Sequence, residues 1–189
     1  MRVNKIVSSS VIILLVTVLF AAAVTVPAAA QTDTMQFRYN AAHTGDYSAV
    51  AGPVPSNGQL KWDYTTGSSV ESSPAVVNGV VYVGSDDNNV YALNATTGAK
   101  LWNYTTGGSV SSSPAVANGV VYVESWDSNL YAINATTGTK LWQYGNPYPM
   151  ESSPAVANGV VYVGSWDGTL NAINATTGTF VWSTLSGAA

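Results

Sequence analysis

Short apolar runs separated by turn residues form the dominant pattern of this chain. Between residues 112 and 144 the runs are SSPAV, VVYV, LYAIN and LWQY. Asn118-Gly119 separates the first two, and Asn-Gly between apolar runs is the strongest short hairpin signal, because both central residues of a type I′ turn need positive φ. VVYV is apolar at every position, which indicates a strand buried on both faces. The pattern predicts four short antiparallel strands, and beyond the N-terminus no segment has the 3.6-residue period of a helix.

The same pattern recurs every forty residues. Residues 112–142 and 152–182 are identical at 25 of 31 positions. A fixed period in this range indicates stacked supersecondary units. Four antiparallel strands per repeat, buried on both faces, predict an all-β fold, a β-propeller of four-stranded antiparallel blades. A β-sandwich also has short strands, but nothing in that fold requires a forty-residue repeat.

The number of repeats predicts an incomplete ring. Blades are expected at residues 71–106, 111–145 and 151–184, followed by a short tail at 185–189. Residues 60–64 precede them as an orphan outer strand. Propellers close with roughly four to eight blades, so the chain is interpreted as a truncated copy of a longer propeller, or as one that closes by self-association. Each terminal blade would then have an apolar face, to which residues 80–83 and Tyr91 contribute.

The repeat V-V-Y-V-x-S-x-D-x-x-L-Y-A-I-N-A-T-T-G-x-K-L-W resembles that of the PQQ-like (quinoprotein alcohol dehydrogenase-like) β-propeller family. The resemblance covers residues 36–182 and includes the opening FRYNAAHTG at 37–45. It implies that a tryptophan of each fourth strand docks on the adjacent blade. The positions concerned are Trp62, Trp102, Trp142 and Trp182, with Gly98, Gly138 and Gly178. One departure is that Asn94, Asn134 and Asn174 stand where the family usually has Asp.

The first thirty residues are typical of a targeting segment. Arg2 and Lys5 precede a sixteen-residue apolar core at 11–26, and the Ala-Ala-Ala at 28–30 offers a cleavage site. The core is short for a membrane span of about 20 residues. We expect a signal peptide, with retention as an N-terminal membrane anchor as the alternative. Either way the rest of the chain would work outside the cytoplasm, as a secreted, periplasmic or cell-surface protein. Residues 31–59 form a polar lead-in.

Composition excludes several classes of function. Without Arg2 and Lys5, four basic residues remain against ten acidic ones, a balance that repels phosphate backbones and excludes nucleic acid as a partner. The chain has no cysteine, so it has no disulfide scaffold. His43 has no second His, Cys or carboxylate cluster nearby to form a metal set, and it is interpreted as a turn residue. No cofactor is expected.

The position of each turn within the meander indicates where a binding surface would lie. Turns one and three of each blade lie at the same edge of the sheet, which we call the first edge. It carries the nearly invariant Asn-Gly and Thr-Thr-Gly turns. Turn two and the links between blades lie at the opposite edge, which we call the second edge. The residues at this edge differ from one repeat to the next. The candidate binding face lies there: Trp126, Asp127, Tyr148, Glu151, Trp166 and Asp167. The alternative is that Asp87, Asp127 and Asp167 only form side-chain turns with their own backbone.

Two further features have open interpretations. Glu124 replaces the glycine of its sister repeats, Gly84 and Gly164, either as a tolerated strand-end substitution or as a functional change. Asn-x-Thr sequons, acceptors for glycans in a secreted chain, occur at Asn94, Asn103, Asn134 and Asn174.

The near-identical repeats and the lack of a nucleophile–base set favour a non-catalytic scaffold that binds a protein partner or another copy of itself. A carbohydrate-binding propeller, with Trp126 and Trp166 as stacking platforms, is one alternative. The other is a fragment of a PQQ-dependent dehydrogenase, although such enzymes resemble this chain only in the repeat. They use about eight blades, a ring of calcium ligands and often a Cys pair. Membrane contact is expected only through an uncleaved N-terminal segment.

Overall fold

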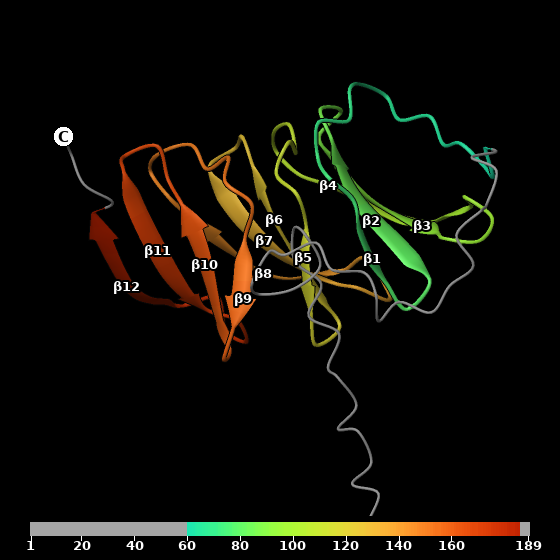
Figure 1. Ribbon diagram of the computed structural model, residues 1–189. Helices are drawn as coiled ribbons and strands as arrows, with labels where there is room; N and C mark the ends of the chain where they lie inside the picture. The colour runs from blue at the N-terminus through green and yellow to red at the C-terminus, as the bar shows by residue number, and fades with distance from the viewer. Residues whose placement is uncertain (1–59, 186–189) are drawn as a thin grey trace, which may run out of the picture. The chain divides into compact units, whose positions relative to one another are not determined.

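Residues 60–185, the part of the chain that the computed structural model describes, contain twelve strands and no helix. The strands form three four-stranded antiparallel sheets, each keeping the order of the sequence (Figure 1). Blade 1 consists of β1 (Ala75–Val77), β2 (Val80–Ser85), β3 (Asn89–Asn94) and β4 (Lys100–Thr105). Blade 2 consists of β5 (Ala115–Ala117), β6 (Val120–Ser125), β7 (Asn129–Asn134) and β8 (Lys140–Gly145). Blade 3 consists of β9 (Ala155–Ala157), β10 (Val160–Gly164), β11 (Thr169–Asn174) and β12 (Phe180–Leu185). The predicted all-β architecture of propeller blades is confirmed, and these residues form no closed ring.

The first hairpin of each blade has the predicted turn chemistry. Asn118 and Gly119 both have positive φ, 51° and 75°, as a type I′ turn requires. The same pair of angles occurs at Asn78-Gly79 and Asn158-Gly159. The turn fixes the register of the hairpin, in which Ala117 lies opposite Val120 and Ala115 opposite Tyr122.

Hydrogen bonds confirm how the turns are divided between the two edges. On the first edge, the Ala135 N–H of turn three donates to the Gly119 carbonyl of turn one at 2.9 Å. On the second edge, Trp126 N–H donates to Ser109 O at 2.9 Å, which joins turn two to the link that enters the same blade. Equivalent bonds recur in all three blades, so the invariant turns lie on one edge and the variable segments on the other.

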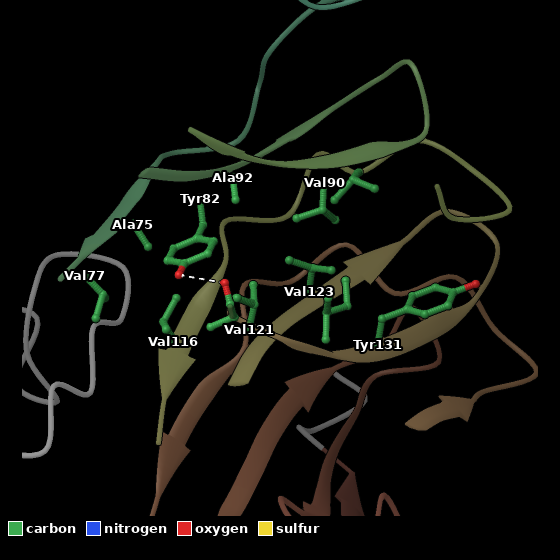
Figure 2. Close-up of a cluster of buried hydrophobic side chains, with 12 residues drawn as sticks. Ala75, Val77, Tyr82, Val90, Ala92, Val116, Val121, Val123 and Tyr131 are labelled. Carbon is green, nitrogen blue, oxygen red and sulfur yellow. Dashed lines mark hydrogen bonds between the residues drawn. The ribbon is translucent and has the colours of Figure 1, made fainter. Parts of the chain in front are cut away.

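The apolar core lies between successive blades, because each sheet buries one face against the next. Tyr82 and Val90 of blade 1 pack against Val121 and Val123 of blade 2 (Figure 2). The Tyr82 hydroxyl crosses this interface and donates to Ala135 O at 3.1 Å. A second cluster with equivalent residues joins blades 2 and 3. Burial on both faces explains why the second strand of each blade begins with four apolar residues.

Residues 60–64, predicted as an orphan outer strand, have no strand assignment. A strand is defined by pairing with a neighbour, and none of the described strands pairs with this segment. Its aromatic side chains nevertheless cover blade 1. Trp62 and Tyr64 pack on the cluster of Val83, Tyr91 and Leu93, with the Tyr64 and Tyr91 rings 5.5 Å apart.

Candidate functional site

The tryptophans of the outer strands dock on the first edge of the following blade. Trp102 Nε1 donates to Ala135 O at 2.9 Å, and Trp142 Nε1 donates to Ala175 O at 3.1 Å. Trp62 makes the same bond to Ala95 O at 3.0 Å. Because the repeat supplies an identical acceptor each time, the docked tryptophan is part of the scaffold that positions the blades.

Glycine is required beneath each docked indole for two reasons. Gly138 has a φ of +72°, which favours glycine, and a Cβ there would lie 2.7 Å from Cδ2 of Trp102. Gly98 and Gly178 have the same geometry beneath Trp62 and Trp142. Trp182 differs, since no described blade follows it: its side chain is 42% exposed and contacts Tyr162 of its own sheet.

The second edge contains a carboxylate clasp in blades 1 and 2. Asp127 Oδ1 accepts from the Asn129 N–H at 3.1 Å, which closes a side-chain turn. Its Oδ2 accepts from the Gly107 N–H at 2.7 Å and from the Tyr131 hydroxyl at 2.5 Å. The clasp therefore holds the link that enters the blade as well as its own turn.

Asp87 has the same role in blade 1, with Asn89, Gly67 and Tyr91 as its partners. Burial alone would raise the pKa of the Asp87 carboxyl, but these hydrogen bonds outweigh burial and lower that pKa below its ordinary value. The ionised carboxylate is thus stabilised by the donors of the clasp. Asp87, Asp127 and Asp167 all form the expected side-chain turn with the residue two positions later, but Asp87 and Asp127 also bridge to the link that enters their blade.

Blade 3 has lost the clasp. Pro147 stands where Gly107 stands in the preceding link, and proline has no N–H to donate. Asn171 replaces Tyr131, so the hydroxyl donor is lost as well. Asp167 is fully exposed and accepts from Thr169 N and Thr169 Oγ1 at 3.0 and 2.6 Å. The Thr169 hydroxyl is the main cause of its lowered pKa. Its negative charge faces solvent.

Two tryptophans form an exposed aromatic pair beside Asp167. Trp126 is 52% exposed and Trp166 is 65% exposed, with ring centroids 6.5 Å apart in an edge-to-face arrangement. Trp166 Nε1 donates to Glu151 Oε2 at 3.1 Å, which orients its ring. Glu151 and Trp166 also line a hollow of about 360 Å³. The structure thus brings together the predicted Trp126, Glu151, Trp166 and Asp167 on adjacent turns of the second edge.

The remaining members of the predicted face behave differently. Asp127 is engaged in the clasp of blade 2. Tyr148 is 49% exposed in the link that enters blade 3, and its N–H donates to Asn146 Oδ1 at 3.0 Å.

Glu124 is a buried carboxyl group between blades 2 and 3. Its side chain is 0% exposed, Oε1 accepts from Ser152 Oγ at 2.8 Å, and Oε2 has no hydrogen-bond partner. Burial raises the pKa of Glu124 to about 8, against the opposing effect of hydrogen bonds from Ser152. At the equivalent Gly84, a Cβ would lie 2.3 Å from Val110 O. The first blade therefore has no room for a side chain at this position, whereas a Cβ at Gly164 of blade 3 would make only ordinary contacts with Ser152, at 3.4 Å or more.

Sequence reasoning did not identify Pro147 or Met150 as important. The sequence carries one signal, which is that several repeat positions change together. The link that enters blade 3 reads GNPYPM where the link that enters blade 2 reads TTGGSV, position 124 has Glu in place of the Gly of the other repeats, and position 171 has Asn in place of Tyr. In the structure, Glu124 bonds to Ser152 just after this link.

The sequon asparagines are engaged in local hydrogen bonds. Asn134 Oδ1 accepts from the backbone of Thr136 and Thr137 at 2.9 Å, and Asn94 and Asn174 do the same in their own turns. Asn103 is exposed on β4, with Nδ2 donating to Asn89 Oδ1 at 3.0 Å. The targeting segment at 1–30, the lead-in with its FRYNAAHTG stretch, His43 and the tail at 186–189 lie outside the described residues.

Within residues 60–185, no group of three His, Cys, Asp or Glu side chains is placed to hold a metal ion. The same part of the chain has no helix with the length and apolar character needed to cross a bilayer.

Comparison with known proteins identifies the family. Residues 47–189 match the family model PQQ_2, described as the outer membrane protein assembly factor BamB. The chain belongs to this BamB-like family of PQQ-repeat propellers. No match to a curated protein was found.

Solved structures agree with the fold of this BamB-like chain. BamB from Moraxella catarrhalis is 23% identical, with a TM-score of 0.60 over 66% of this chain and 40% of that one. A europium-containing methanol dehydrogenase is 27% identical, with a TM-score of 0.61 over 67% of this chain and 27% of that one. The quinohemoprotein alcohol dehydrogenase ADHIIG from Pseudomonas putida HK5 is 31% identical, with a TM-score of 0.57, and the match covers 61% and 20% of the two chains. The BamB-like chain thus spans less than half of each protein.

Proposed function

We propose that this chain is a non-catalytic scaffold that works outside the cytoplasm and holds a protein partner on its second edge. One observation carries the proposal: the repeats diverge at the second edge, and the divergence releases side chains from structural bonds. Asp167 has lost two donors of the clasp, while Trp126 and Trp166 are more than half exposed. A surface that only had to fold would retain the clasp, which stabilises the other two blades.

The family supports both parts of the proposal. The model that matches is described as an outer membrane protein assembly factor, a description of a protein that acts with other proteins at an outer membrane. A targeting segment at residues 1–30, removed as a signal peptide or retained as an anchor, would bring the chain out of the cytoplasm.

Site-specific photo-crosslinking in cells of the native host tests the proposal. A photoreactive phenylalanine derivative replaces Trp166 on the second edge, and in a matched variant it replaces Thr176, exposed on the first edge of the same blade. We expect discrete adducts with protein partners from position 166 and none from position 176. Equal labelling from both edges, or none from position 166, would contradict the proposal.

A carbohydrate-binding propeller is the second candidate, favoured by the exposed pair of Trp126 and Trp166, because sugar rings stack on exposed aromatic faces. The edge-to-face arrangement, with an interplanar angle of 62°, is less suited to a flat platform than coplanar rings would be. Quenching of tryptophan fluorescence by surface oligosaccharides tests this candidate. Alcohol-dependent dye reduction with added pyrroloquinoline quinone and calcium tests the dehydrogenase alternative, and we expect no turnover.

A further inference from the structure

Charge is segregated between the two ends of the blades. Lys100 and Lys140 lie where outer strands β4 and β8 begin, after the turns of the first edge, and the third lysine of residues 60–185 is Lys61, next to the docked Trp62. Lys100 Nζ donates to Asn103 and Lys140 Nζ to Gln143, both neutral amides. The second edge instead carries carboxylates in its links and turns: Glu71, Asp86, Asp87, Asp127, Glu151 and Asp167. No lysine or arginine of the described range shares this edge with them, so its negative charge is uncompensated.

Aromatic and acidic side chains occupy equivalent positions along this edge. The residue after the second strand is Asp86 in blade 1, Trp126 in blade 2 and Trp166 in blade 3. In each blade its backbone N–H is fixed to the link, with bonds to Ser69 O, Ser109 O and Pro149 O of 2.9, 2.9 and 3.1 Å. These positions therefore form a rigid row across successive blades, with carboxylates on the adjacent turn residues.

We propose that this row binds an extended, basic peptide segment of the protein partner, with a lysine or arginine over each indole. The proposal rests on the proposed function and specifies the partner's chemistry. Cations are attracted to the face of an exposed tryptophan ring, because the ring face is electron-rich. The nearby carboxylates of Asp167 and Glu151 add long-range attraction for the same charge. An acidic or purely apolar partner would gain neither contribution.

The spacing of the row predicts the spacing of the basic residues. The Trp126 and Trp166 centroids are 6.5 Å apart. An extended chain rises roughly 3.3 Å per residue, so residues i and i+2 are about 6.6 Å apart and point to the same side. The recognised segment is thus a basic-x-basic sequence, with its two cationic side chains on one face.

Three seven-residue peptides test the inference against the purified full-length chain. The first carries two lysines in alternate positions of a Gly/Ser sequence, the second carries the same lysines adjacent to each other, and the third has glutamates in place of the alternate lysines. Binding is measured by fluorescence titration and calorimetry at low and at physiological salt. We expect the alternate-lysine peptide to bind best, the glutamate peptide not to bind, and salt to weaken binding.

Variants of the chain locate the site. Trp126→Ala with Trp166→Ala should weaken binding of the alternate-lysine peptide roughly tenfold, as expected for two cation–π contacts. Leu101→Ala with Leu141→Ala, two residues exposed on outer strands away from the row, should leave it unchanged. Urea melts of both double variants verify that they fold.

Two results would overturn the inference while leaving the scaffold function intact. One is photo-crosslinking of proteins from position 166 with no binding of the alternate-lysine peptide. The other is binding that is equal for the lysine and glutamate peptides or unaffected by loss of both tryptophans. Loss of both the adducts and peptide binding would overturn the scaffold function as well.

Discussion

A single carboxyl group distinguishes the interface between blades 2 and 3 from that between blades 1 and 2. Glu124 is fully buried with one oxygen unpaired, and its raised pKa of about 8 means that the folded protein favours the protonated form. The unfolded chain has the ordinary carboxyl pKa of about 4.3. Between these two values the unfolded state loses its proton more readily, so stability falls as pH rises from about 4 to about 8 and then levels off.

Glu124→Gln, which resembles the protonated side chain, should therefore act in a pH-dependent way. We expect it to raise the free energy of unfolding at about pH 8.5 by on the order of 1–3 kcal/mol and to change it little near pH 4. Urea denaturation at both pH values measures the effect. Glu71→Gln, in an exposed link, is the control and should show no such difference. An effect of equal size at both pH values would refute ionisation as the cause.

Two glycines on the first edge allow the cost of a strained backbone to be measured apart from the cost of a clash with tryptophan. Gly138 and Gly119 have φ values of +72° and +75°, but a Cβ meets Trp102 only at Gly138, since nothing lies within 4 Å of a Cβ at Gly119. Alanine at either position costs roughly 1–2 kcal/mol for its left-handed backbone. We expect Gly138→Ala to lose about 1–3 kcal/mol more, the usual cost of overpacking. Thermal or urea melts measure both variants, and equal losses would show that the indole simply moves.

At the scale of strands and turns, most of the structure could be predicted because its causes are local. Asn118-Gly119 specifies its own hairpin, and the four-residue apolar run of β6 indicates its own burial. The division of turns between the edges follows from the meander alone, so the sequence could place Trp126, Trp166 and Asp167 on the same edge.

What could not be predicted depends on residues far apart in the sequence. The exposure of Asp167 requires both Pro147 and Asn171, and neither has meaning until the clasp of Asp127 with Gly107 and Tyr131 is seen. Similarly, the hydrogen bond of the buried Glu124 comes from Ser152, twenty-eight residues later. Residues 60–64 read as a strand from their own sequence, but strand pairing requires a neighbour.

Outer strands β8 and β12 provide a matched test of docking. Trp142 in β8 bonds to Ala175 O over Gly178, whereas Trp182, at the same position of β12, is 42% exposed. We expect Trp142→Ala to cost about 3–5 kcal/mol, as large truncations in packed sites do, and Trp182→Ala to cost about 1 kcal/mol or less. Denaturant melts of the two variants measure the difference. Similar losses would mean that the indole stabilises its own sheet more than the interface.

On the scale of the whole molecule, the two terminal blades differ in how their outer faces are covered. Trp62 and Tyr64 cover the cluster of Val83, Tyr91 and Leu93 on blade 1, so the apolar face expected there is not bare. On blade 3, Leu170 is 37% exposed, while its counterpart Leu130 in blade 2 is 0% exposed. Together with Trp182, it forms the kind of apolar surface that other blades bury.

Among residues 60–185 this face is left partly exposed, which predicts that the chain from Gln31 onward self-associates. Contiguous apolar surfaces are rare on soluble monomers, and residues equivalent to Leu170 and Trp182 bury themselves against a blade elsewhere in the same chain. Light scattering on a sizing column at tens of micromolar should show a dimer or larger species. Leu170→Asp should shift the chain towards monomer, because it places a charge on that face. Leu141→Asp, on an exposed outer-strand position away from the face, should leave the assembly unchanged. A stable monomer of the unmodified chain at this concentration would show that the face of blade 3 is tolerated in water.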